Sequence, residues 1–258
     1  MDTKGQKSVV PKRIDGEWKC CGETMIRRPV NEGLDMFICG TCEQRITQHT
    51  WPNEINDPFS TENPLDALNK YQRKRLINRW DAGDFGKRYR EGKWQICNEL
   101  LYDSIHRWHK QEERGFFLSS SVGTGKTVAM GMMMACLSAR NEFSFCYTSC
   151  LKLFSFLHNW KGWGYDYDAD DLMRKYENSK YLFIDDIGVE YNSPFALSRF
   201  NELVEHRYGN MLHFVCSSNQ LAKDLMNREG WGRVVDRLKD DADDWVMFEG
   251  KSLRGEVR

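Results

Sequence analysis

The chain has 258 residues, enough for one small and one large domain, and its 40% apolar and 29% charged content is ordinary for a folded soluble protein. The net charge of −1 excludes a uniformly basic nucleic-acid coat, so any contact with DNA must come from a local patch. The longest apolar stretch, Val128–Ala139, is shorter than the roughly 18–20 residues that span a bilayer, and the polar N-terminus has no secretory signal. We therefore expect a cytoplasmic protein without a membrane partner.

The first 50 residues carry four of the nine cysteines. Cys20 and Cys21 are adjacent, and Cys39 and Cys42 follow after 17 residues with the usual CxxC spacing. Disulfides are not expected without an export signal, so the cluster predicts a zinc-ribbon-like domain with these four thiolates as Zn²⁺ ligands. His49 could replace Cys20, because adjacent cysteines are unusual ligands. A segment with so few apolar residues needs such a metal to fold, and a closed site suits docking rather than catalysis.

A turn-rich stretch with three prolines follows at Trp51–Pro64 and is typical of a linker. Beyond it, apolar residues at helical spacing predict two helices, at Leu65–Trp80 and at Trp94–Lys110. The run Lys70–Lys93 holds nine Lys or Arg against three Asp or Glu. This run is either a solvated helix face or a surface for DNA or a partner.

From Gly115 the pattern alternates between apolar strands and helices. The expected strands are Phe116–Ser119, Phe143–Ser149, Tyr181–Ile184 and Leu212–Ser217, and the expected helices are Lys126–Arg140, Leu151–Trp160 and Pro194–Tyr208. Such alternation predicts an α/β fold with a parallel sheet between two layers of helices, a three-layer αβα core. The predicted organisation is a partner-docking domain at 1–50, a linker at 51–64, and an α/β domain with leading helices at 65–258.

The segment FFLSSSVGTGKTVAM joins a strand to a helix through a glycine-containing loop. Gly123 and Gly125 let backbone N–H groups turn toward an anion, and the helix start adds further N–H groups. Lys126 would reach the β- and γ-phosphates of ATP, and the Thr127 hydroxyl would hold Mg²⁺. Ser120 stands where the P-loop pattern has glycine, a departure that the other small residues make tolerable. The predicted nucleotide-binding residues are Ser121, Val122, Gly123, Thr124, Gly125, Lys126, Thr127 and Asp185.

An apolar strand, YLFIDDIG, ends in two carboxylates 59 residues after Lys126. This is the pattern of a Walker B strand, in which Asp185 contacts Mg²⁺ through water and Asp186 polarises the attacking water. Without the P-loop, the same pattern would indicate only a strand end capped by solvated acids. The pairing with a P-loop at this separation favours the nucleotide interpretation.

Taken in order, GTGKT, FIDDIG, CSSN, GRVVDRL and the tail MFEGKSLRG resemble the DnaC/DnaI family of replicative helicase loaders, which have an AAA+ core. The IstB transposition helpers share that core. The resemblance covers about residues 65–258. It implies an ATPase that binds single-stranded DNA, with an N-terminal domain that docks onto the hexameric replicative helicase. AAA+ proteins often carry Glu at the position of Asp186, which is one methylene shorter.

The resemblance also assigns roles to two residues nearer the C-terminus. Asn219 occupies the place of a sensor-1 residue, although Asn at a strand end is also a common turn former. Arg237 matches the arginine finger offered to the ATP of a neighbouring subunit, with Arg233 as the alternative. A surface ion pair with Asp236 or Asp240 is the competing interpretation of Arg237. The predicted catalytic residues are Lys126, Asp185, Asp186, Asn219 and Arg237.

The aromatic-rich stretch Leu151–Tyr167 lies where loaders carry an extra helix that lines the DNA channel. Some of its aromatic residues, at helical spacing, must belong to the core. Lys161 and Trp163, in a loop flanked by glycines, are the candidates for DNA contact through charge and base stacking.

Three functions follow from these motifs. The first is an ATP-dependent helicase loader in DNA replication initiation, with slow, partner-stimulated hydrolysis, in a bacterial or phage-infected bacterial cell. The second is an IstB-like transposition helper, and the third is a nucleotide-gated DNA-binding adaptor with little turnover. The expected cofactors are ATP, Mg²⁺ and Zn²⁺, and the expected partners are the helicase, single-stranded DNA and further copies of the chain.

Overall fold

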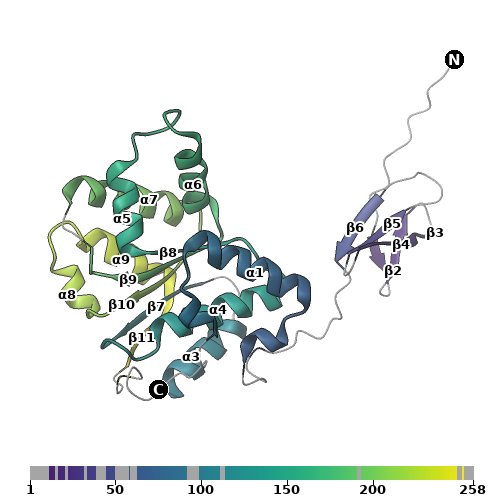
Figure 1. Cartoon of the computed structure of the whole chain (residues 1–258), viewed down its shortest axis with the longest axis horizontal. Helices are drawn as coiled ribbons and strands as arrows, with labels where there is room; N and C mark the ends of the chain where they lie inside the picture. The colour runs from purple at the N-terminus through teal and green to yellow at the C-terminus, as the bar shows by residue number, and fades with distance from the viewer. Residues whose placement is uncertain are drawn as a thin grey trace. The chain divides into compact units, whose positions relative to one another are not determined.

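The computed structural model describes residues 12–14, 17–20, 23–31, 34–38, 45–49, 58, 63–91, 99–110, 114–190, 193–248 and 252. The chain divides into two compact units, Met1–Ile55 and Asn56–Arg258 (Figure 1). Among the helices of the described ranges, none combines the length and the apolar character that crossing a bilayer requires.

The first unit contains two antiparallel sheets of three strands each, ordered β1-β2-β3 and β4-β5-β6. The strands are β1 (Lys12–Ile14), β2 (Glu17–Cys20), β3 (Glu23–Thr24), β4 (Ile26–Asn31), β5 (Leu34–Ile38) and β6 (Arg45–His49). Cys20 ends β2 and pairs with Glu23 across the β2–β3 hairpin. Cys21, Cys39 and Cys42 lie outside the described residues, as do the side chains of Cys20 and His49, so the zinc site stays a prediction.

The second unit is built on a parallel sheet of five strands in the order β11-β7-β10-β9-β8. The strands are β7 (Gly115–Ser120), β8 (Phe145–Ser149), β9 (Tyr181–Ile187), β10 (His213–Ser218) and β11 (Ala242–Phe248). The predicted parallel sheet is confirmed. The edge strand β11 is an addition, because its polar beginning, ADD, hides the strand pattern in the sequence. All five carboxyl ends meet at one edge of the sheet, where parallel α/β sheets bind ligands.

Helices surround this sheet. They are η2 (Pro64–Ala67, a 3₁₀ helix), α1 (Lys70–Gly83), α2 (Lys87–Glu91), α3 (Glu99–Lys110), α4 (Lys126–Ala139), α5 (Cys150–Asn159), α6 (Tyr167–Asn178), α7 (Pro194–Gly209), α8 (Ala222–Met226) and α9 (Gly232–Asp241). Side chains alternate along each strand and so divide the core into two layers. Phe116 and Phe183 pack with α1, α3 and α4, whereas Phe117 and Ile184 pack with α5 to α9 (Figure 1). The predicted three-layer αβα core is therefore confirmed.

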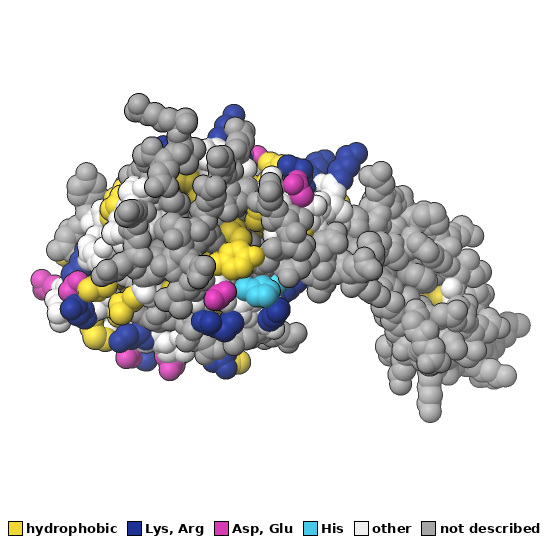
Figure 2. Space-filling model, turned by 90° about the horizontal axis from the view of Figure 1, so that it is seen from below, with side chains coloured by type: hydrophobic (Ala, Val, Ile, Leu, Met, Phe, Trp, Pro, Cys, Tyr) yellow, Lys and Arg dark blue, Asp and Glu magenta, His cyan; other side chains and the backbone are white. Residues whose placement is uncertain are grey.

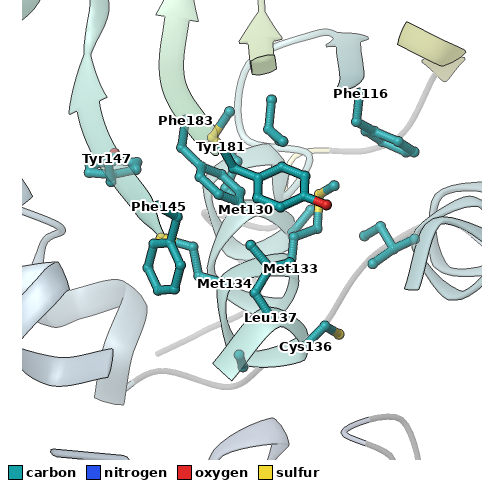
Figure 3. Packing of buried hydrophobic residues seen from close by; sticks show 14 of the residues in the cluster. Phe116, Met130, Met133, Met134, Cys136, Leu137, Phe145, Tyr147, Tyr181 and Phe183 are labelled. Atoms are coloured by element: carbon teal, nitrogen blue, oxygen red, sulfur yellow. The ribbon is translucent and has the colours of Figure 1, made fainter. Parts of the chain in front are cut away.

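Helix α4 is apolar on nearly all sides because it is buried on nearly all sides. Its methionines Met133 and Met134 lie among aromatic side chains of the sheet, including Phe145 and Phe183 (Figure 3). Each side chain of this size contributes roughly 1.5–3 kcal/mol when it is fully buried. This packing fixes the helix whose first residue is Lys126.

The predicted helix Leu65–Trp80 is wrong in its first part, because η2 and α1 are separate. The Asn69 side chain accepts a hydrogen bond from the Gln72 N–H at 2.9 Å, and the Gln72 side chain accepts one from the Asn69 N–H at 3.1 Å. This capping box starts a new helix at Lys70 and is worth about 1 kcal/mol. The predicted helix Trp94–Lys110 is present as α3, with residues 92–98 outside the described ranges.

The coloured surface in Figure 2 carries Lys and Arg side chains interspersed with Asp and Glu, in line with the net charge of −1. Part of the basic run on α1 and α2 serves packing within the unit. Arg90 pairs with Asp81 at 2.5 Å, and the guanidinium of Arg75 lies 3.9 Å from the centre of the Phe143 ring. These contacts favour a structural role for at least these two arginines.

Candidate active site

The loop between β7 and α4 has the backbone that its glycines permit. Gly123 and Gly125 have φ of 85° and 97°, a region that residues with side chains rarely adopt. The hydroxyl groups of Ser120 and Thr124 hydrogen-bond each other, and the Thr124 hydroxyl also donates to the Ser121 carbonyl at 3.0 Å. Gly125 caps α4, so the N-terminal N–H groups of the helix and the positive end of its dipole lie at this loop.

Lys126 is 5% exposed, and several oxygens surround its ammonium group. It donates to the carbonyls of Ser120 at 3.0 Å and Ser121 at 2.8 Å, and to Asn219 Oδ1 at 2.7 Å. The Ser120 hydroxyl lies 3.3 Å from the same nitrogen. The residue that departs from the P-loop pattern therefore adds an oxygen ligand for the lysine.

Three hydroxyl groups hold the buried carboxylate of Asp185. Thr127 Oγ1 donates to Asp185 Oδ2 at 2.8 Å, the Tyr147 hydroxyl donates to the same oxygen at 3.0 Å, and Ser217 donates to Asp185 Oδ1. Burial, and next the charge of Asp185, raises the pKa of Tyr147, so the phenol keeps its proton. These three donors fix the orientation of the carboxylate.

Asn219 joins the lysine to the second carboxylate. Its Oδ1 accepts from Lys126, and its Nδ2 donates to Asp186 Oδ1 at 3.1 Å. The residues predicted from separate motifs on β7, α4, β9 and β10 thus form one hydrogen-bonded network at the carboxyl edge of the sheet. Among the described side chains, no group of three or more His, Cys, Asp and Glu is arranged to hold a metal ion. The Thr127–Asp185 pair instead suits Mg²⁺, which keeps several waters and binds few protein ligands.

The sequence matches none of the protein-family models against which it was compared, and no curated protein matches it. Solved structures do match. The DnaI crystal structure has a TM-score of 0.50 at 19% identity, covering 62% of this chain and 87% of that chain. The DnaC helicase loader has a TM-score of 0.51 at 18% identity, covering 64% of this chain and 100% of that chain. The second unit therefore shares the fold of the DnaI and DnaC structures.

The described contacts of Arg237 are local to α7 and α9. Arg237 lies 3.4 Å from Glu205 and 3.3 Å from Asp236, and its guanidinium lies 4.7 Å from the centre of the Tyr208 ring. Arg233 also pairs with Glu205, at 2.8 Å. The structure therefore gives Arg237 ion pairs within its own chain, including the pair with Asp236 that the sequence suggested as an alternative.

The predicted DNA-contact residues of the second unit, Lys161 and Trp163, lie on the connection between α5 and α6. Lys161 is exposed, and Trp163 is 46% exposed. Gly162 and Gly164 have φ of 105° and 84°, and a side chain on either would meet nothing within 4 Å. Trp160 is buried, as expected for an aromatic residue at helical spacing. The connection is therefore an exposed aromatic segment anchored by a core tryptophan.

Arginines from two further helices extend this segment into a ladder of aromatic and cationic groups. Arg174 of α6 lies 5.3 Å from the Trp163 ring, which meets the Trp160 ring edge to face at 5.4 Å. Arg199 of α7 lies 5.3 Å from Trp160 and 5.5 Å from the ring of Phe195, which is half exposed. The two arginines and Phe195 could not be identified from the sequence, because only the packing of α6 and α7 in the folded unit brings them to the loop.

Tyr147 and Ser217 are the other two residues that the sequence analysis did not identify. The only signal for them in the sequence is that each is a polar residue within a predicted strand, Tyr147 in FCYTS and Ser217 in HFVCSS. Their contacts with Asp185 depend on β8 and β10 lying on either side of β9. The motif spacing does not specify that order of strands.

Proposed function

We propose that this chain is an AAA+ ATPase that binds ATP with Mg²⁺ between the β7–α4 loop and the acidic end of β9. The observation that supports this most directly is the network from Thr127 to Asp185 and from Lys126 through Asn219 to Asp186. P-loop ATPases need these groups, a phosphate-binding lysine, a magnesium ligand pair and a carboxylate near the lytic water, at one place.

In this proposal each residue has a separate task. Residues 121–127 would offer backbone N–H groups to the phosphates, and Lys126 would neutralise their charge. Thr127 directly, and Asp185 through water, would hold Mg²⁺, which would supply charge neutralisation on the phosphates. Asp186 would orient the attacking water and accept its proton, while Asn219 keeps that carboxylate beside the lysine.

Titration of the full-length chain with ATP in magnesium buffer, followed by steady-state hydrolysis, tests the ATPase proposal. We expect binding in the micromolar range and slow turnover that single-stranded DNA or the helicase accelerates. Heat of binding without turnover under any of these conditions would favour a nucleotide-gated adaptor. No binding at all would contradict the proposed site.

We also propose that the chain binds single-stranded DNA, as a helicase loader does. The binding surface would be Lys161 together with the aromatic and cationic ladder of Arg174, Trp163, Trp160, Arg199 and Phe195. Base stacking on an aromatic side chain is worth roughly 1–3 kcal/mol, and cations on both sides of the rings attract the phosphate backbone. Fluorescence anisotropy with a labelled thymidine oligonucleotide measures this binding. A strong preference for duplex DNA would favour the IstB-like transposition helper instead.

The proposed partner of the N-terminal unit is a hexameric replicative helicase, and the proposed metal is Zn²⁺. Cys20 ends one strand of the β2–β3 hairpin, and Ile38, next to Cys39, is paired with Arg45 across β5 and β6. Four cysteines in this part of the sequence would supply the four thiol donors of a ribbon site. Metal analysis should find one zinc per chain. A chain lacking residues 1–55 should lose the helicase in co-purification, and full retention would refute the docking role.

A third proposal is self-association with Arg237 as a trans arginine finger. In that arrangement Arg237 would exchange its partners Glu205 and Asp236 for the phosphates of a neighbouring copy. Mixing experiments test it, because Lys126→Ala and Arg237→Ala chains would each be inactive alone. The mixture should recover part of the hydrolysis rate, since it contains interfaces with one intact site and one intact finger. No recovery would argue for the local ion-pair role.

A further inference from the structure

The acidic end of β9 departs from regular strand geometry at the two carboxylates. β9 and β10 pair in register up to Cys216 opposite Ile184, and then the register shifts so that Ser218 pairs with Ile187. Asp185 and Asp186 together therefore lie opposite the single residue Ser217. This two-to-one arrangement is a β-bulge, and Asp186 has the φ of +58° that gives it its local turn.

The bulge explains how two consecutive residues can serve one site. In a regular strand, successive side chains point to opposite faces of the sheet. Here Asp185 contacts Thr127, while Asp186 contacts Asn219, which in turn contacts Lys126. Asp185 thus reaches the start of α4 directly and Asp186 is linked to it through Asn219, and a positive φ at a residue other than glycine is the backbone feature that accompanies this.

A single hydroxyl group connects the two halves of the bulge. Ser217 Oγ accepts a hydrogen bond from the Asp186 N–H at 2.9 Å and donates its own proton to Asp185 Oδ1. Ser217 has no exposed surface, so water does not substitute for either bond. A hydroxyl is suited to this place because it is a donor and an acceptor at once, whereas an alanine would lose both hydrogen bonds.

We propose that Ser217 is a positioning residue that sets both carboxylates of the site through these two hydrogen bonds. The proposal rests on the ATPase function proposed above. It assigns to Ser217 no contact with the nucleotide. Its effect on hydrolysis would pass through the magnesium ligand Asp185 and through the backbone of Asp186. The neighbouring Ser218 differs in this respect, because its hydroxyl bonds only to backbone groups, the Ile187 carbonyl and the Gln220 N–H.

The test compares Ser217→Ala with wild type in the full-length chain, using a fluorescent ATP analogue. In EDTA the affinity for the analogue should agree within about twofold, because Ser217 does not touch the phosphate loop. The Mg²⁺ concentration for half-maximal enhancement of binding should rise about tenfold, as expected when a partner of a metal-binding carboxylate is lost. The value of kcat for ATP should fall about tenfold or more while KM changes little.

Ser217→Thr keeps the hydroxyl and should restore the Mg²⁺ requirement and kcat to within about threefold of wild type. Ser138→Ala is the matched control, because Ser138 is another fully buried serine, and it bonds only to the Met134 carbonyl within α4. It should leave all three quantities unchanged. Thermal unfolding shows whether the Ser217→Ala chain folds. If it does not, Ser217→Cys replaces it, because the thiol is a weak donor of similar size; its Mg²⁺ requirement should rise and its kcat should fall, each by less than about tenfold.

Two outcomes overturn the proposal. If wild type binds the analogue and Ser217→Ala matches it in Mg²⁺ requirement and kcat, the positioning role is wrong while the ATPase function stands. If Ser217→Thr folds as wild type does but fails to restore either quantity, the hydroxyl is not what matters. A wild-type chain that binds no nucleotide contradicts the proposed function itself, and with it the role of Ser217.

Discussion

The carboxyl edge of the sheet and the α5–α6 connection are built in opposite ways. At the sheet edge, the charged groups of Lys126 and Asp185 are buried, and each is held by three or more polar partners. On the α5–α6 connection, Trp163 is half exposed, lies between two open glycines, and touches its neighbours only through ring contacts.

The difference matches what each region is proposed to do. Phosphate transfer requires charges fixed before the reaction, since reorganising them during it would cost free energy. Stacking on unpaired bases tolerates variation, because every base offers a flat face to an aromatic ring. Substitutions at the sheet edge should therefore have large effects on one chemical step, whereas substitutions on the connection should have moderate effects on affinity alone.

The largest expected effect is that of Lys126→Met, which tests the carboxyl edge of the sheet. It removes the cation that would meet the phosphates and should lower ATP affinity at least about 100-fold, because hydrogen bonds to charged groups are worth roughly 1.5–3 kcal/mol each. Calorimetric titration in magnesium buffer measures the affinity. Lys152→Met on α5 is the control, since Lys152 pairs with Asp84 away from the loop. Equal affinity in wild type and Lys126→Met would mean that ATP binds elsewhere.

Asp186→Asn should separate binding from hydrolysis at the same edge. We expect hydrolysis to fall by roughly 10²–10⁴-fold, the usual contribution of a general base, with ATP affinity nearly unchanged. Asn tolerates the positive φ of this position, so the backbone should not suffer. Single-turnover hydrolysis measures the step. Asp186→Ala should also lower the melting temperature, because alanine disfavours this φ, and an Asn variant as active as wild type would show that another group orients the water.

Trp163→Ala tests the α5–α6 connection and should have a moderate effect on the affinity for single-stranded DNA. Loss of one stacking platform should weaken single-stranded DNA binding by roughly 5- to 100-fold, while ATP hydrolysis without DNA stays at the wild-type rate. Anisotropy titrations with a thymidine oligonucleotide measure the first quantity. Tyr102→Ala, an aromatic residue on α3 that is 37% exposed, is the matched control and should bind DNA as wild type does. An equal loss in both variants would place the DNA elsewhere.

The two regions also differ in how well the sequence predicted them. The glycine loop between β7 and α4 and the two carboxylates at the end of β9 could be placed from the sequence because each motif is local: a strand, a few residues with special chemistry, and a helix or turn. The partners that fix Asp185 could not be predicted in the same way. Tyr147 and Ser217 are 38 and 32 residues from it in the chain, and their contacts require a particular strand order and a bulge.

For the exposed region, the sequence predicted that some aromatic residues at helical spacing are core and that Trp163 lies in a loop flanked by glycines; Trp160 is buried and Trp163 is exposed. The arginines that extend the ladder come from α6 and α7, and no local pattern indicates which helices pack against α5. The capping box at Asn69 is a different case. Its signal, Asn followed three residues later by Gln, was present in the sequence but was outweighed by the apolar pattern that runs through it.

Tyr147→Phe should give the smallest effect and separates orientation from packing at the sheet edge. The ring would keep its edge-to-face contact with Phe85 at 5.0 Å, but Asp185 would lose one of its three hydroxyl donors. We expect hydrolysis to fall only a few-fold and the free energy of unfolding at pH 7 to fall by about 0.5–1.5 kcal/mol, the usual worth of a single hydrogen bond.

The pH dependence of stability distinguishes this hydrogen bond from a simple change in packing. Because burial and Asp185 raise the pKa of Tyr147 in the folded chain, its stabilising contribution is complete below the unfolded value of about 10 and is lost as the pH rises above it. Wild type should therefore lose stability relative to Tyr147→Phe between about pH 9.5 and pH 11, as measured by denaturant unfolding. If wild type and Tyr147→Phe instead keep a constant difference in stability across this range, the phenol is not held protonated against Asp185, and the arrangement at the sheet edge is less constrained than its geometry implies.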